Sequence, residues 1–212
     1  MYRIYNRVER EKYKQILKRK TIGDTMCTTL EQFRNKTAHD LLVESEQVNN
    51  MPVSLDAILE YYGVDKIPSS FDSIEKHPSN KGKGEISGLV LSNGEALGVF
   101  YKKTDSIHRK RFTIAHELAH CCLHTDALKN GYVERRNPDY SDEKEFAADI
   151  FAGELLIPEH QLEYAIQRLL KPTLYGLAEI FEVSTNVMRA RLEYLGKPYF
   201  DDSIGKYIAM EN

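Results

Sequence analysis

The sequence predicts an α+β fold that is mostly helical, with a small antiparallel β-hairpin and two C-terminal helices arranged as in a helix-turn-helix. Two observations predict this class. Apolar residues recur at helical spacing in several separate stretches, and two β-prone runs flank Asn93-Gly94, a dipeptide that favours a tight type I′ turn. The length of 212 residues and the 42% hydrophobic content fit one domain with a sizeable core and room for a small appendage.

The N-terminal arm differs in charge from the rest of the chain. Residues 1–20 contain eight Lys/Arg and two Glu, a formal charge of +6, whereas the whole chain carries −3. Apolar residues of the arm fall loosely at helical spacing, which predicts an amphipathic helix with a basic face. We prefer docking of this helix on the domain, with a nucleic-acid-binding or partner-binding arm as the alternative. Residues 1–26 are assigned to a basic N-terminal extension.

Neither secretion nor membrane insertion is predicted. Charged residues interrupt the start of the chain where a cleavable signal is apolar, and no run approaches the length of a membrane span. Cys27, Cys121 and Cys122 form an odd set without disulfide-framework spacing, so we interpret them as reduced thiols. These features predict a cytoplasmic protein with no membrane partner.

Helices are predicted before and after residue 50. Residues 28–47 show one helical pattern, and Ser54 suits the N-cap of a short helix that ends at Gly63, which suits a left-handed conformation. The inward residues of that short helix are Leu55, Ile58, Leu59 and Tyr62. Residues 65–84 are polar and rich in Pro, Gly and Ser, which predicts a loop.

The second half of the chain alternates helices with caps. The hairpin EISGLVLSNGEALGVFY leads into a helix, and after a loop Ser141 or Asp142 can cap the next helix. Pro158 suits an early position of the helix that follows. Thr173 and Ser184 can each cap one of the last two helices, which gives the helix-turn-helix pattern.

The stretch RFTIAHELAHCCLH contains an HExxH motif formed by His116, Glu117 and His120. Residues four apart on a helix lie one above the other, so both imidazoles can bind one ion at about 2.0–2.1 Å. Glu117 lies about 100° around the helix axis, beside the metal, where a general base for a metal-bound water belongs. The structural alternative is a helix whose histidines only contact polar neighbours.

Other residues of this stretch are not expected to bind the metal. His124 continues the four-residue series, but eight residues rise about 12 Å along a helix, too far for one ion to reach His116 and His124 together. Cys122 is predicted to pack on the buried face as a small apolar side chain, and Cys121 to lie between the faces, pointing away from His116 and His120. The buried face is predicted to consist of Ala115, Leu118, Ala119, Cys122 and Leu123.

The third ligand is predicted downstream, in EKEFAADIFAGELLIP. Glu145, Ala148 and Ala152 share one helix face, and the two small alanines allow close packing against the histidine helix. Glu145 would complete a His₂Glu site with an open position for water, the pattern of catalytic zinc. Asp149 can accept the second ring N–H of a ligand histidine. Glu143 is the competing carboxylate, but it points elsewhere and suits a first-turn acid.

Four stretches, taken in order, resemble the ImmA/IrrE family of metallopeptidases. They are ISGLVLSNGEALGVFY, RFTIAHELAHCCLH, EFAADIFAGELLIP and LAEIFEVSTNVMRARLEYLG, within about residues 50–196. The resemblance implies a zincin-like, gluzincin-type core with a metallopeptidase domain at residues 27–158 and a C-terminal helical, helix-turn-helix-like region and tail at 159–212.

The resemblance also implies a set of roles. His116, His120 and Glu145 would bind one Zn²⁺ per chain, with Mn²⁺ or Fe²⁺ as alternatives, and Glu117 would be the catalytic acid. Members of the family typically cleave a helix-turn-helix repressor or antitoxin encoded nearby, in mobile-element, phage or stress regulation, and related proteins occur in toxin–antitoxin modules. The implied function is therefore a zinc-dependent endopeptidase acting on such a partner.

Details of substrate handling follow from general chemistry. Glu117 would take the proton of the attacking water and pass it to the leaving amine. An edge of the hairpin at residues 85–102 can hold an extended substrate strand by β-augmentation. The oxyanion needs a further donor, for which the candidates are Tyr101, His108, His124, Tyr132 and Tyr140.

Two other function classes stay open. A DNA-binding regulator would use the helix that carries Arg189 and Arg191, but residues 159–197 contain five basic and five acidic residues, whereas DNA readers usually show a basic excess. We prefer packing or partner docking for these helices. A non-catalytic or latent toxin–antitoxin component would use the zinc fold only to grip its partner, and such a site has no need of a base such as Glu117.

Overall fold

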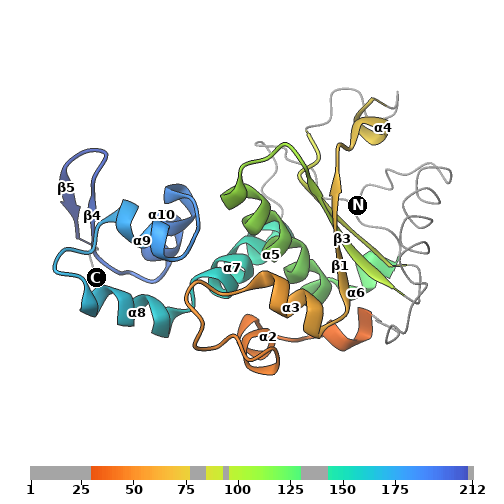
Figure 1. Cartoon of the computed structure of the whole chain (residues 1–212), viewed down its shortest axis with the longest axis horizontal. Coiled ribbons are helices and arrows are strands. Elements are labelled where there is room, and N and C mark those ends of the chain that lie inside the picture. The colour runs from red at the N-terminus through yellow and green to blue at the C-terminus, as the bar shows by residue number, and fades with distance from the viewer. Residues whose placement is uncertain (1–29, 77–84, 93–95, 130–142, 210–212) are drawn as a thin grey trace.

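The computed structural model describes residues 30–76, 85–92, 96–129 and 143–209. The predicted basic extension, Cys27, the Asn93-Gly94 turn and the proposed caps Ser141 and Asp142 lie outside them. The fold class is α+β, as predicted, with a small sheet at one end, helices in the middle and the C-terminal helices at the other end (Figure 1). None of the described helices is long and apolar enough to cross a membrane.

Helices dominate the described part of the chain. They are η1 (Leu30–Phe33), α2 (Ala38–Glu44), α3 (Leu55–Tyr61), α4 (Asp72–Glu75), α5 (Ile107–Leu123), α6 (Thr125–Lys129), α7 (Glu143–Leu156), α8 (Glu159–Arg168), α9 (Leu174–Ile180) and α10 (Thr185–Tyr194). The strands are β1 (Val64–Ser69), β2 (Gly88–Ser92), β3 (Leu97–Lys102), β4 (Tyr199–Asp201) and β5 (Lys206–Ile208).

The larger sheet has three strands in the order β1-β3-β2. The predicted antiparallel hairpin is confirmed as β2 and β3. Ser92 lies opposite Leu97 in this register.

The predicted loop at residues 65–84 is wrong in its first part, which forms β1 and α4. Strand β1 pairs in parallel with β3, with Ile67 opposite Phe100. A proline is tolerated at a sheet edge, where its missing N–H removes no ladder hydrogen bond, and Pro68 lies in such an edge strand. The partner strand is distant in sequence, so local composition gave no sign of the pairing.

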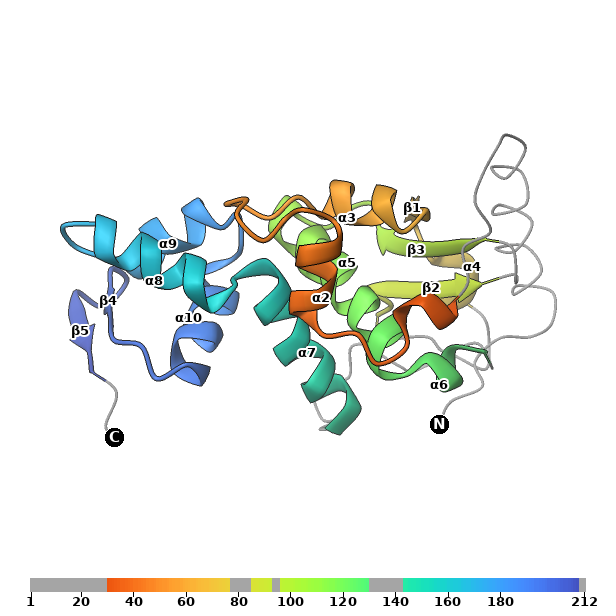
Figure 2. The ribbon, with the colours of Figure 1, turned by 90° about the horizontal axis from the view of Figure 1, so that it is seen from below.

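Both faces of the sheet are buried. One face contributes Val90 and Val99 to the main core, in which α5 packs against β2 and β3. The other face contributes Leu89 and Phe100 to a second core cluster around Phe71. Helix α7 packs along α5, and α2 and α3 pack against α7 and α5 respectively (Figure 2). The helix pair α5–α7 therefore forms the middle layer of the molecule.

The N-terminal helical pattern is divided rather than continuous. The predicted single helix at 28–47 is wrong: η1 and α2 are separated at Asn35, whose φ is 59°. Thr37 caps α2, because its hydroxyl accepts from the Asp40 N–H and the Asp40 carboxylate accepts from the Thr37 N–H. This capping box starts a new helix inside the pattern.

The other predicted helix ends agree with the structure. The Ser54 hydroxyl caps α3 by accepting the Ala57 N–H, and Gly63 has a φ of 63°. The four predicted inward residues of α3 are buried. Pro158 occupies the N-cap of α8, while the hydroxyls of Thr173 and Ser184 cap α9 and α10. The β4–β5 pair follows α10 and was not predicted.

Candidate metal centre

Helix α5 is a buried helix that carries polar side chains. The Ser106 hydroxyl caps it by accepting the Arg109 N–H, and His124 lies at its C-cap. Every residue from Thr113 to Cys122 is buried. Burying ionisable groups in this way costs free energy unless they have partners. The burial of His116, Glu117 and His120 therefore needs a structural or chemical explanation.

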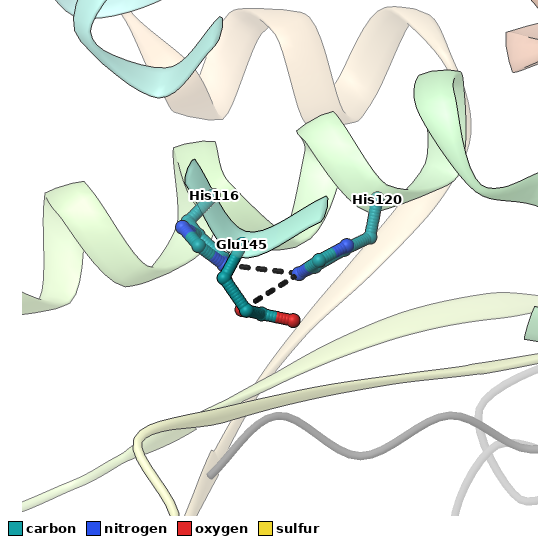
Figure 3. Close-up of side chains that lie close together, drawn as sticks. All are labelled: His116, His120 and Glu145. Carbon is teal, nitrogen blue, oxygen red and sulfur yellow. Dashed lines mark hydrogen bonds and ion pairs between the residues drawn. The ribbon is translucent and has the colours of Figure 1, made fainter. Parts of the chain in front are cut away.

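Two rings of α5 and one carboxylate of α7 converge on a single point (Figure 3). The Nε2 atoms of His116 and His120 lie 2.9 Å apart. Oε2 of Glu145 lies 3.2 Å from the first and 3.5 Å from the second. Ala148 and Ala152, both fully buried, allow α7 to approach α5 closely. We refer to these three residues as the His-His-Glu cluster.

The cluster has the dimensions of a metal site. Two ligands on a tetrahedral zinc at about 2.0–2.1 Å lie roughly 3.3–3.4 Å apart. The three observed separations of 2.9, 3.2 and 3.5 Å bracket that value. Among the described residues, this is the one group of three or more His, Cys, Asp or Glu ligand atoms that is close enough to share an ion. The cluster can therefore hold a metal.

The second nitrogen of His116 is held by Asp149, as predicted. Nδ1 of His116 lies 2.8 Å from Oδ1 of Asp149. A carboxylate only accepts, so Nδ1 carries the proton and donates it. In a neutral ring, Nε2 then presents its lone pair to the cluster.

The second nitrogen of His120 has a different partner. Its Nδ1 lies 2.9 Å from Nδ1 of His124, one turn further along α5. His124 was a candidate for stabilising an oxyanion, but this contact places its ring behind His120. It is also absent from the group that can share an ion, in agreement with its exclusion as a ligand. The four-residue spacing of His116, His120 and His124 was the available signal for this contact.

The electrostatics of Glu145 match its position. Burial alone would raise the pKa of this carboxyl, but its contacts with the rings of His116 and His120 outweigh burial and lower the pKa to about 2. Glu145 is therefore a carboxylate at neutral pH, the form that binds metals. The rival Glu143 is exposed in the first turn of α7.

Glu117 follows His116 on α5 and lies on the face of the helix that meets the sheet. Its side chain is fully buried. A Cβ placed on Gly88 of β2 would lie 2.3 Å from its Oε1 atom, which shows how closely the strand covers the carboxylate. The base predicted from HExxH therefore occupies a slot between α5 and β2.

The remaining predicted positions are either not part of the cluster or outside the described residues. Cys121 and Cys122 are buried free thiols, and burial raises the pKa of each thiol well above its ordinary value. The predicted buried face of α5 is correct except at Leu123, which is 43% exposed because it lies at the helix end. Tyr101 lies opposite Gly88 on β3, and His108 lies in the first turn of α5. Tyr132 and Tyr140 are outside the described residues.

A cavity of about 400 Å³ opens next to the cluster, between α5, α7 and α10. Asp149 belongs to both its wall and the contact with His116. The wall is otherwise mainly apolar, with Phe112, Phe146, Ile150, Val187, Ala190 and Tyr194.

The helix pair with its His-His-Glu cluster defines a metallopeptidase-type domain. The model of one peptidase family, M78, described as an IrrE N-terminal-like domain, matches residues 76–193, more than half of the chain. The chain belongs to this family, as the resemblance to ImmA/IrrE proteins predicted. No curated protein matches the chain significantly.

Proposed function

We propose that the chain is a zinc-dependent endopeptidase. The observation that carries this proposal is the convergence of the His-His-Glu cluster on the helix that also carries the buried Glu117. His116, His120 and Glu145 would hold the zinc through Nε2, Nε2 and Oε2. When bound, zinc supplies Lewis acidity, which polarises the substrate carbonyl and brings the pKa of a coordinated water toward about 7.

Each residue around the zinc then has a task. Glu117 accepts the proton of the attacking water and returns it to the leaving amine. Asp149 keeps the proton of His116 on Nδ1 and so fixes the ligand tautomer. His124 accepts the Nδ1 proton of His120 in the same way. A purely structural zinc site would need neither an open position nor a base.

The sheet offers a place for the substrate backbone. Strand β2 is an edge strand in the order β1-β3-β2 and passes over α5 at Glu117. An extended peptide that pairs with this edge would lie next to the cluster, and its main-chain hydrogen bonds would contribute affinity. We infer that the enzyme cuts an extended or locally unfolded segment.

We propose that the substrate is a helix-turn-helix repressor or an antitoxin. This proposal rests on the substrates that the resemblance to the ImmA/IrrE family implies. A DNA-binding role is less favoured, because the two arginines on which it relied make contacts within the chain. Arg189 pairs with Asp201 at 2.8 Å, and Nε of the buried Arg191 donates to the Ile157 carbonyl.

The direct test is cleavage of a helix-turn-helix protein encoded next to this gene, co-expressed with wild type or Glu117→Gln. We expect wild type to cut the partner, and Glu117→Gln to retain one zinc by elemental analysis without cutting. Cleavage by Glu117→Gln at the wild-type rate would reject the role of the base. Zinc in both proteins with cleavage by neither would favour the non-catalytic or latent function.

A further inference from the structure

Gly88 lies where β2 passes over α5. Side chains alternate along a strand, so Gly88 and Val90 face α5, whereas Leu89 faces the second core cluster. A Cβ on Gly88 would lie 2.3 Å from Oε1 and 2.9 Å from Cδ of Glu117, and 2.6 Å from Cγ2 of Thr113. These separations are well below van der Waals contact, so a side chain at this position must displace its neighbours.

The backbone of Gly88 gives no other reason for glycine. The described glycines with positive φ are Gly63, Gly196 and Gly205, and Gly88 is not among them. An alanine can therefore adopt the same backbone conformation without strain. The close approach of the strand to the helix is the remaining requirement.

The displaced group would be the carboxylate of Glu117. Thr113 and Glu117 are one turn apart on α5, and both are buried against β2. A carboxylate moved by about 1 Å leaves productive geometry, a displacement that commonly costs about a hundredfold in rate. The missing side chain at Gly88 thus defines where the base can lie.

We propose that Gly88 is a positioning residue for Glu117: its bare Cα lets the edge strand close over the carboxylate and hold it beside the His-His-Glu cluster. This inference rests on the proposed function, because it assigns a means of aligning the proposed base. It differs from a packing role, in which Gly88→Ala would lower stability without changing the chemistry of the zinc site.

The test uses the zinc-loaded full chain and acetohydroxamate as a probe, with affinity measured by calorimetry. A hydroxamate binds zinc as an anion, and the nearby base takes up its proton. All variants carry Thr113→Ser, which removes the methyl that a Cβ at position 88 would also strike. We expect Gly88→Ala to keep one zinc and to weaken acetohydroxamate binding about tenfold or more.

A shorter base supplies the compensating change. Glu117→Asp withdraws the carboxylate by one methylene, so adding Gly88→Ala to Glu117→Asp should change affinity by less than about twofold. Gly153→Ala is the matched control, because a Cβ there lies 3.7 Å from Cδ of Arg191, an ordinary contact. It should leave acetohydroxamate affinity unchanged.

The possible results separate the two proposals. If Gly88→Ala binds acetohydroxamate as tightly as its Thr113→Ser parent, the inference is overturned but the peptidase proposal stays intact. The same holds if the losses of affinity from Gly88→Ala and Glu117→Asp are fully additive in the double variant. A wild type that holds no zinc rejects the proposed function and the inference with it. If Gly88→Ala does not fold, recovery of folding by Glu117→Asp supports the inference, and failure to recover overturns it.

Discussion

The helix pairs α5–α7 and α9–α10 handle buried polar groups in opposite ways. In α9–α10, opposite charges and matched hydrogen-bonding groups meet: Arg189 contacts Asp201 at 2.8 Å, and Arg191 donates to the Ile157 carbonyl at 3.1 Å. In α5–α7, two imidazole nitrogens and a carboxylate oxygen approach one another within 3.5 Å. The first pattern stabilises a fold by itself, whereas the second brings together atoms that all bind cations.

The two motifs differ in the groups that surround their polar side chains. In the HExxH motif, both histidines lie on α5, and a second helix, α7, brings a carboxylate to the same point. The helix-turn-helix pattern is backed by contacts that use its arginines internally. The histidines of the first motif therefore meet a carboxylate in an arrangement that can bind a cation, whereas the arginines of the second contact a carboxylate and a carbonyl of the chain.

Removal of Glu145 is expected to have the largest effect. We expect Glu145→Ala to lower zinc affinity by more than about a hundredfold, beyond the range of changes outside the ligand set. Glu143→Ala, two residues earlier on α7 and exposed, is the matched control and should bind zinc like wild type. Competition with a chromogenic chelator measures both. Wild-type zinc affinity in Glu145→Ala would remove Glu145 from the site.

A smaller loss of zinc affinity is expected when the residues that contact Nδ1 of the two histidines are changed. Asp149→Ala and His124→Ala should each weaken zinc binding by about 10–100-fold, because each leaves one ligand ring without its Nδ1 partner. His160→Ala serves as the control, since that ring contacts the Val48 carbonyl instead. Unchanged affinity in both test variants would show that the rings are oriented by packing alone.

In α10, a substitution is expected to lower stability without changing zinc content. Arg191→Met should reduce the free energy of unfolding by about 1–3 kcal/mol, because the buried guanidinium contact to the Ile157 carbonyl is lost. Zinc content should stay at the wild-type value. Thermal melting and elemental analysis provide the two readouts, with Arg168→Met as an exposed control. Loss of zinc in Arg191→Met would mean that the two helix pairs are not separable.

The smallest expected effect is a pH dependence of folding stability that arises in the C-terminal part of the chain. Hydrogen bonds from Ser203 lower the pKa of Asp201 below its ordinary value of 3.8, and Arg189 adds to the shift. The ionised carboxylate thus stabilises the folded state above pH 3.8, and this contribution is lost as the pH falls toward the lower, folded-state pKa. Melting temperature below pH 3.8 should fall more steeply in wild type than in Asp201→Asn. Parallel curves would contradict this assignment.

Sequence spacing predicted which side chains of α5 and α7 converge better than it predicted the sheet. The four-residue rule placed His116 with His120 on one face of α5. The same kind of spacing placed Glu145 on the small-residue face of α7, and both relations are local to one helix. Strand β1 was missed because it depends on pairing with β3, which lies about 30 residues away. Pro68 also argued locally against a strand.

Two further features could not be predicted for related reasons. The break at Asn35 depends on competition between a helical pattern and the capping box at Thr37, which favours a new helix start. The proximity of Gly88 to Glu117 depends on the distance between a strand and a helix. Spacing along one chain segment carries no information about that distance.

X-ray absorption at the zinc edge of the purified wild-type protein measures whether two histidine nitrogens and one carboxylate oxygen bind zinc. We predict one zinc per chain with nitrogen and oxygen ligands at about 2.0–2.2 Å and two imidazoles in the outer scattering. A sulfur ligand at about 2.3 Å, or a purified protein that binds no zinc even after reconstitution with the metal, would contradict this assignment of ligands.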